Sequence, residues 1–383
     1  MHTNPVLTSL GTYPLEIVQH RARDRRDAGL PLIDFSIGDP REPTPAFIPA
    51  TLKDHVPVVS QYPTAKGLPV IREAVAGYLK RRFGVTVDPD TQVIPTSGSK
   101  EAIFLTPLAF VERGAGDGVI YGTPGYPVYE RGALFAGARV DPVVLSGDFI
   151  MRSSDISDEA MAGAALVWMC SPHNPAGSVT PVDEMERILE RTRQAGAWLC
   201  SDECYVDLYD DEPPGSVLQV AGEGFRGALS YLSLSKRSGM TGYRSGAIVG
   251  DAEAIAAIRA LRSTVGVAPA EFVQHAGAAA WSDDEHASER RDTFRKKRAI
   301  LRSAFVEMGH EVVGSDAGLY LWVRVDDDEA ATLALLEHGI VVAPGRAFGP
   351  GGEGYLRLAL VPTVAKCEES AEMIRKVLSV PAN

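Results

Sequence analysis

The sequence has little cysteine, no long apolar run and a deficit of positive charge. Its four cysteines form no CxxC pair and no spacing typical of metal ligands, so we expect reduced, mostly buried thiols and no metal site; they stand at positions 170, 200, 204 and 367. The longest apolar stretch, around 164–170, is far shorter than the roughly 20 residues that cross a bilayer. With 38 basic and 50 acidic residues the net charge is −12, which disfavours a nucleic-acid-binding surface.

The N-terminal segment also lacks the features of a targeting signal. It has neither a basic start nor an apolar stretch, so we expect no signal peptide. These absences together predict a soluble cytoplasmic protein, without a membrane or a nucleic acid as partner.

Short apolar runs alternate with amphipathic segments through the first two thirds of the chain. This alternation predicts an α/β sheet covered by helices on both faces. The expected strands lie near 93–94, 119–121, 140–144, 166–170, 198–200, 229–232 and 247–249. A helix through Ile71 and Leu79 should end near Gly84, and further helices are expected over 99–112, 127–136 and 183–195.

Long helical stretches and then a smaller α+β pattern follow this region. The helices are expected near 252–264, 271–281 and 287–308, and the smaller pattern has strands at 319–325, 340–343 and 355–360 with helices at 328–338 and 366–379. A length of 383 residues favours two domains. We place the large domain at 41–265 and the small one at 266–383.

The run Ser233-Leu234-Ser235-Lys236-Arg237-Ser238 places a lysine among hydroxyl groups, and the glycine-rich segment 239–246 follows it. A buried strand at 229–232 precedes the run, so Lys236 should emerge at a strand end. A lysine stripped of water has a lowered pKa and is a nucleophilic amine, while serines, glycine backbone and Arg244 can hold a phosphate. An amine beside a phosphate cradle indicates pyridoxal phosphate. The alternative is a polar surface loop.

Three more polar motifs follow predicted strands and should reach the same edge of the sheet. Gly98, Ser99 and Lys100 open a helix, where backbone N–H groups favour a phosphate, although such a segment taken alone is more often an ordinary helix cap. Asn174 lies in a proline-rich turn and offers an amide, or simply turn chemistry. Asp202 ends an apolar strand and needs a cationic partner, either a protonated pyridine nitrogen or a structural ion pair.

Arg357 is the candidate for binding a carboxylate. In Tyr355-Leu356-Arg357-Leu358-Ala359-Leu360, strict alternation puts the leucines on one face of a strand and the arginine on the other. A guanidinium that faces a cleft can bind a carboxylate through two parallel hydrogen bonds. A surface salt bridge is the alternative.

Taken together, these segments closely resemble the class I/II aminotransferases of fold type I, which use pyridoxal 5′-phosphate. The matching segments are SGSKEA at 97–102, PGYPVY at 124–129, NPAG at 174–177, SDECY at 201–205, SLSKR at 233–237 and GYRSG at 242–246. The resemblance implies a large domain with a mainly parallel sheet between helices and a smaller α+β domain. It also implies an N-terminal arm, residues 1–40, that packs with the small domain.

The resemblance also implies a role for each matching residue. Lys236 would bind the cofactor as a Schiff base and move the proton, Asp202 would pair with the ring nitrogen, and Tyr205 and Asn174 would bind the phenolic oxygen. Tyr126 would stack on the ring. The phosphate would be held by Gly98, Ser99, Lys100, Ser233, Ser235 and Arg244, and by Tyr62 of a neighbouring copy in a homodimer with shared sites. Arg357, assisted by Gly38 and Asn174, would bind the substrate carboxylate.

For the reaction, the resemblance implies transamination between glutamate and a dicarboxylic amino acid. Within the family the segments are most similar to the aminotransferases of N-succinyl-LL-diaminopimelate in lysine biosynthesis. The alternatives are aspartate, alanine or LL-diaminopimelate aminotransferases, a C–S β-lyase, or a non-catalytic cofactor-binding regulator. A distal carboxylate would need a second cation, and the candidates are Arg41, Lys66, Arg237 and Arg346.

Overall fold

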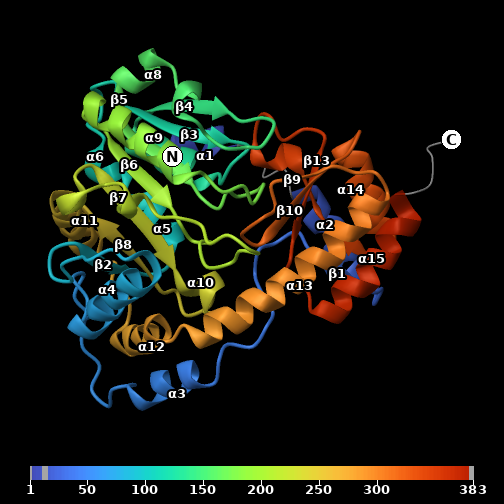
Figure 1. Cartoon of the computed structure of the whole chain (residues 1–383), viewed down its shortest axis with the longest axis horizontal. Helices are drawn as coiled ribbons and strands as arrows, with labels where there is room; N and C mark the ends of the chain where they lie inside the picture. The colour runs from blue at the N-terminus through green and yellow to red at the C-terminus, as the bar shows by residue number, and fades with distance from the viewer. Residues whose placement is uncertain (1, 11–15, 379–383) are drawn as a thin grey trace.

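A computed structural model of the chain describes residues 2–10 and 16–378. A seven-stranded sheet forms its larger part (Figure 1), and its strands are β2 (Val93–Thr96), β3 (Gly118–Thr123), β4 (Arg139–Val144), β5 (Ala164–Cys170), β6 (Trp198–Asp202), β7 (Ala228–Ser233) and β8 (Gly246–Gly250). Their order is β2-β8-β7-β6-β5-β3-β4. Strand β8 is antiparallel to both neighbours, whereas the pairs from β7 to β4 are parallel.

Helices surround this sheet and continue into the C-terminal third. They are α1 (Pro5–Ser9), α2 (Glu16–Asp27), α3 (Phe47–Asp54), α4 (Pro69–Phe83), α5 (Ser99–Leu105), α6 (Pro107–Phe110), α7 (Val128–Ala136), α8 (Asp158–Ala162), α9 (Val182–Ala195), α10 (Leu234–Arg237), α11 (Ala252–Val265), α12 (Glu271–Ser282), α13 (Glu285–Glu307), α14 (Asp328–Glu337) and α15 (Val364–Leu378). Within residues 2–10 and 16–378, none of them has the length and apolar character to span a membrane.

Side-chain alternation divides the core of the large sheet into two layers. Ile94, Leu166 and Ile248 face a cluster that includes residues of α5, α7 and α11. The neighbouring positions Val93 and Val167 face the other way, into a cluster with α4, α9 and α12. Strands buried on both faces carry apolar residues at successive positions, which is why these segments read as continuous apolar runs. The predicted α/β sheet between helices is confirmed.

A smaller antiparallel sheet lies beside the large one. Its order is β12-β13-β10-β9, with bounds β9 (Val312–Val313), β10 (Tyr320–Arg324), β12 (Ala343–Pro344) and β13 (Tyr355–Ala359). Helices α13, α14 and α15 cover it, and their residues share one buried cluster with the sheet. The long α13 runs between the two parts of the molecule (Figure 1).

The N-terminal residues are divided between the two parts: α2 and β1 contact the smaller part, whereas Leu10, just after α1, lines a hollow beside β3 and α7 of the large sheet. Strand β1 (Ile33–Asp34) pairs in parallel with β11 (Ile340–Val341), and Val18 and Ala22 of α2 pack with Leu336 and Val341. Helix α12 packs on α3 and α4 beside the large sheet, although the predicted boundary at 265–266 would assign it to the small domain. The division of the chain into domains stays a prediction.

Two expected elements differ in detail from the structure. The helix expected over 99–112 is broken into α5 and α6 at Pro107, because proline has no N–H to continue the helical ladder. The strand expected over 340–343 is two short strands, β11 and β12, which pair with different partners. The expected helix end at Gly84 is confirmed, with this residue in the left-handed conformation at a φ of 70°.

Candidate active site

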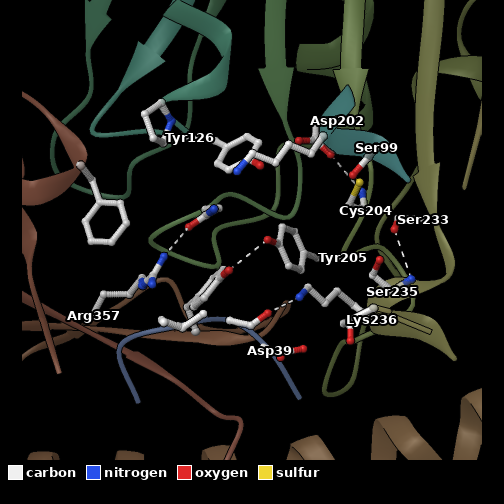
Figure 2. A pocket seen from close by; sticks show the side chains of 18 of the residues that line it. Asp39, Ser99, Tyr126, Asp202, Cys204, Tyr205, Ser233, Ser235, Lys236 and Arg357 are labelled. Atoms are coloured by element: carbon white, nitrogen blue, oxygen red, sulfur yellow. Dashed lines mark hydrogen bonds between the residues drawn. The ribbon is translucent and has the colours of Figure 1, made fainter. Parts of the chain in front are cut away.

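A cavity of about 480 Å³ lies at the carboxyl ends of the parallel strands, between the large sheet and the smaller one (Figure 2). The large sheet contributes side chains that follow β2, β3, β5, β6 and β7, and the smaller part contributes residues of β10 and β13 and the segment 36–39. The sequence-predicted residues that line it are Gly38, Ser99, Lys100, Tyr126, Asn174, Asp202, Tyr205, Ser233, Ser235, Lys236, Arg244 and Arg357. The predicted convergence of four strand-end motifs on one edge is therefore present in the structure.

Lys236 projects into the cavity from α10, a single helical turn at the end of β7 (Figure 2). Its Nζ donates a hydrogen bond to the carbonyl oxygen of Gly38. Burial lowers its pKa from 10.5 to about 8, with Asp39 opposing the shift and Arg290 adding to it. About a tenth of the amine is then neutral at pH 7, which makes Lys236 a nucleophile near physiological pH.

Asp202 is the last residue of β6 and is 3% exposed. The Tyr129 hydroxyl donates to its Oδ2 at 2.7 Å, and the Cys204 amide donates to its Oδ1 at 3.2 Å. Burial raises the pKa of this carboxyl group. Across residues 2–10 and 16–378, no lysine, arginine or histidine pairs with it. A positively charged ligand atom beside it would therefore stabilise the buried carboxylate.

The floor of the cavity near the start of α5 is suited to an anion. Gly98 precedes α5 with a φ of 83°, and a Cβ there would lie 2.4 Å from Nη2 of Arg244. Only glycine therefore allows the Arg244 guanidinium to lie against the helix start. Ser99 begins α5, and Ser233 and Ser235 approach from the end of β7. A guanidinium, hydroxyl groups and free helix-start N–H groups together form a site that favours a phosphate.

Two tyrosines meet in the middle of the cavity. The hydroxyl groups of Tyr205 and Tyr320 are 3.0 Å apart, and burial raises the pKa of both. Tyr320 begins β10 of the smaller sheet, whereas Tyr205 follows β6 of the large one. The pair thus joins the two parts of the molecule at the site.

Arg357 lies in the middle of β13 and is 6% exposed. Its Nη1 donates to Oδ1 of Asn174 at 3.3 Å and its Nη2 to the Ser36 carbonyl at 2.5 Å. Its Nε is buried and has no hydrogen-bond partner among the described residues. The rings of Tyr320 and Phe348 flank the guanidinium at 4.4 and 4.3 Å. All of these contacts are to neutral groups.

The buried arginines and lysines that lie outside the cavity are paired. In the part of the chain that the structure describes, each has a carboxylate oxygen within 4.0 Å; they are Arg72, Arg237, Arg262, Arg290, Lys297 and Arg298. Among the described residues, Arg357 has no carboxylate oxygen within this distance. A buried guanidinium without an acidic partner, open to a cavity, is suited to bind the carboxylate of a ligand.

Comparison with known proteins shows which family shares this arrangement. The family described as aminotransferase class I and II matches residues 31–374. The chain belongs to this aminotransferase family. An LL-diaminopimelate aminotransferase from Aquifex aeolicus is 34% identical over 381 residues, which cover 97% of this chain and 98% of that protein.

Solved structures agree with the family assignment. An aminotransferase from Neisseria meningitidis superposes with a TM-score of 0.91 at 33% identity and covers 98% of this chain and 99% of its own. A probable N-succinyldiaminopimelate aminotransferase from Thermus thermophilus gives a TM-score of 0.88 at 28% identity, over 94% of this chain and 99% of that one.

Class I and II aminotransferases use pyridoxal 5′-phosphate, and the cavity of this aminotransferase fits that group. The unpaired carboxylate of Asp202 suits a protonated ring nitrogen, the amine of Lys236 suits an aldehyde, and the Gly98–Arg244 floor suits a phosphate. When bound, this cofactor supplies a ring that takes up electrons from the substrate α-carbon.

Two predicted cofactor residues do not line the cavity of the aminotransferase. Gly98 lies directly behind it, against Arg244. Tyr62 is 100% exposed in the loop between α3 and α4. Its predicted contact is with a neighbouring copy of the chain, so its position in one copy leaves that prediction open.

The structure brings none of the four candidate cations for a distal carboxylate into the cavity. Arg237 pairs with Asp207 and Asp284, and Lys66 with Asp90. Arg41 is exposed outside the cavity.

Arg346, the fourth of these cations, lines an adjoining hollow that shares Tyr126 and Phe348 with the cavity. Asp328 and Glu329 already neutralise it there.

Sequence reasoning missed several residues that line the cavity, chiefly Ser36, Asp39, Cys204, Tyr320 and Phe348. Asp39 and Cys204 each adjoin a predicted site residue, so proximity in the sequence was an available signal. Tyr320 and Phe348 belong to the smaller part and reach the site only through the packing of the two sheets.

Proposed function

We propose that this aminotransferase acts on amino acids of the diaminopimelate series, with glutamate as the other amino donor. The observation on which the proposal rests is that two cations line the same cavity: the nucleophilic Lys236 and the buried Arg357, which has no acidic partner among the described residues. Arg357 would hold the substrate α-carboxylate and so direct the α-carbon towards Lys236. The Lys236 amine would then accept the proton that leaves this carbon.

We assign the remaining residues from their contacts. Asp202, held by Tyr129 and the Cys204 amide, would keep a positive charge on the cofactor ring nitrogen. Tyr205 and Asn174 would donate hydrogen bonds to the phenolic oxygen, and Tyr126 would cover the ring. Ser99, Lys100, Ser233, Ser235 and Arg244 would bind the phosphate.

For the substrate we favour LL-diaminopimelate over its N-succinyl derivative. Asp39 lines the cavity and its charge acts on Lys236, whereas none of the four candidate cations reaches the cavity. A carboxylate there favours a substrate with a second ammonium group and disfavours a succinyl carboxylate. The relative from Aquifex aeolicus, an LL-diaminopimelate aminotransferase, supports this choice, and the likeness to the Thermus thermophilus structure supports the N-succinyl alternative.

We also propose a homodimer with shared sites. The loop that carries Tyr62 exposes three further apolar side chains, Val56 at 54%, Val58 at 104% and Val59 at 75%. Such a patch is typical of a surface that another protein covers. A partner copy would also supply a cation for the distal carboxylate of glutamate, because none of the four candidates of this chain lines the cavity. The cytoplasmic location stays a prediction.

A half-reaction screen of the purified cofactor-bound protein tests the substrate. We expect LL-diaminopimelate and glutamate to convert the cofactor, as followed by its absorption band, with kcat/KM for LL-diaminopimelate above that for N-succinyl-LL-diaminopimelate. Because the charge of Asp39 also acts on Lys236, Asp39→Asn should change kcat/KM for both substrates, and the value for LL-diaminopimelate should fall by about fivefold relative to that for glutamate. A preference for the succinylated substrate would overturn our choice, and release of pyruvate and ammonia from cystathionine would identify a lyase.

A further inference from the structure

The segment 36–42 contributes backbone oxygens to both key cations of the cavity. The Ser36 carbonyl accepts a hydrogen bond from Arg357, and the Gly38 carbonyl accepts one from Lys236. Gly38 lies so close to Tyr320 that a Cβ would be 2.5 Å from the tyrosine hydroxyl oxygen. A small displacement of this segment would therefore disturb the lysine, the arginine and the tyrosine pair together (Figure 2).

Glu42 connects this segment to α13. Its carboxylate contacts Nζ of Lys297, which is fully buried and also donates to the Leu360 carbonyl at 3.1 Å. The second carboxylate oxygen of Glu42 is 4.0 Å from Nη2 of Arg290. Arg290 in turn donates from Nε to the carbonyl oxygen of Lys236 at 2.8 Å. One acidic side chain thus ties the segment to a helix that also holds the backbone of the cavity lysine.

The charges around Glu42 make it hard to replace. Arg290 and Lys297 are buried, and among the described residues Glu42 is the carboxylate that pairs with either of them. Its Oε2 and the Arg290 Nη2 are both buried, and neither has a hydrogen-bond partner within residues 2–10 and 16–378. Two opposite, unsatisfied groups at this separation need only a small approach to form a charge-assisted hydrogen bond.

We propose that Glu42 is a positioning residue of the aminotransferase, which holds segment 36–42 against Lys236 and Arg357 and balances the charge of Arg290 beside the lysine. The inference rests on the roles proposed above for Lys236 and Arg357. It does not depend on the identity of the substrate.

The charge balance predicts an effect on the lysine itself. Lys236 faces Asp39, Cys204, Arg290 and Arg357, and Arg290 lowers its pKa. Glu42 faces Arg290 and Lys297 of α13 and Cys367 of α15. Removing the charge of Glu42 leaves the positive charge of Arg290 uncompensated. The Lys236 nitrogen then becomes harder to protonate, so its pKa falls.

The test uses Glu42→Gln in the cofactor-bound protein, with two readouts. We expect KM for the amino acid to rise about tenfold with a smaller change in kcat, and the pH titration of the cofactor absorption band to move to lower pH. Glu42→Asp, which keeps the charge but shortens the side chain, should raise KM and leave the titration near that of the unchanged protein. It carries the test if the glutamine variant does not fold.

Asp210→Asn is the matched control, because Asp210 pairs with the buried Arg298 of the same helix. We expect it to lower thermal stability without moving the titration. The double variant Glu42→Gln/Lys297→Met removes one buried charge of each sign, and should recover stability but not KM.

The proposal is overturned if Glu42→Gln lowers stability but leaves KM and the titration as they are in Asp210→Asn. Lys236→Met separates this result from a failure of the proposed function. If that variant keeps the absorption band and turnover, the role of Lys236 is wrong whatever Glu42 does.

Discussion

Replacing Arg357 by methionine should abolish most activity towards amino acids while leaving the protein as stable as before. The guanidinium is 6% exposed and donates to two neutral oxygens, those of Asn174 and Ser36. Among the described residues its Nε has no hydrogen-bond partner and no carboxylate oxygen lies within 4.0 Å of the guanidinium, unlike the buried arginines and lysines outside the cavity. Its removal therefore leaves no opposite charge stranded in the interior.

The absence of an acidic partner sets the expected effects of Arg357→Met on kcat/KM and on the free energy of unfolding. Truncating one partner of a buried, hydrogen-bonded charge pair between protein and ligand costs about 2–5 kcal/mol. The loss corresponds to a fall in kcat/KM of about 30- to 5000-fold for a substrate whose carboxylate binds Arg357. The free energy of unfolding should stay within about 1 kcal/mol, since the lost hydrogen bonds are offset by relief of an uncompensated buried charge.

Arg262→Met provides the contrast. Arg262 is fully buried, and its Nη1 contacts both carboxylate oxygens of Glu101 at 2.6 and 2.7 Å. Breaking this pair leaves Glu101 without its cation, which should lower the free energy of unfolding by about 2–3 kcal/mol, less than for a fully buried pair because the Glu101 side chain is 23% exposed.

Urea unfolding and single-turnover kinetics of the two variants decide the matter. An amine substrate without a carboxylate should react equally with the Arg357→Met variant and the unchanged protein, because it never uses the guanidinium. The reasoning fails if Arg357→Met keeps kcat/KM for amino acids within threefold, or if it destabilises the protein as much as Arg262→Met does.

Three further predictions concern the rest of the cavity. Burial lowers the pKa of Lys236 from 10.5 to about 8, so burying its charge destabilises the fold fully below pH 8 and no longer does so towards pH 10.5. Lys236→Met should therefore raise the unfolding free energy of the cofactor-free chain at pH 7. A gain that does not shrink with rising pH would contradict this. Gly98→Ala places a Cβ 2.4 Å from Arg244 at a φ of 83° and should weaken pyridoxal 5′-phosphate binding by about tenfold in an absorbance titration, with unchanged affinity as the opposing result. Tyr320→Phe removes the hydroxyl 3.0 Å from that of Tyr205 and should lower kcat/KM by about 2- to 12-fold, whereas an unaltered rate would show that the pair is dispensable.

The large sheet and the site residues at its strand ends could be predicted, because short segments of the sequence specify both. Strands buried on both faces appear as apolar runs, and the polar residues directly after them, such as Asp202 and Lys236, must emerge at the carboxyl edge. Alternation places Arg357 on the polar face of its strand, and only the resemblance to a family places it in the same site as these residues.

The rest depends on contacts between residues far apart in the sequence. Arg237 was a candidate for binding a substrate carboxylate, but Asp207 and Asp284 pair with it in the interior. Nothing in the neighbouring sequence indicates those partners. In the same way Tyr320 reaches Tyr205 only because the two sheets pack against each other, and a short strand such as β10 does not specify that packing.

The cavity differs from the interior in how its charges are balanced, and this difference links stability to function. Among the residues that the structure describes, no cation pairs with the buried carboxyl group of Asp202 and no acid pairs with the buried guanidinium of Arg357. Each raises the free energy of the empty protein, and each is satisfied by a ligand group of opposite sign, a ring nitrogen for Asp202 and an α-carboxylate for Arg357. A ligand that satisfies both should therefore stabilise the folded state by more than one that satisfies either alone at the same concentration, since a ligand that binds only the native state at free concentration c stabilises it by RT ln(1 + c/Kd), which grows as Kd falls.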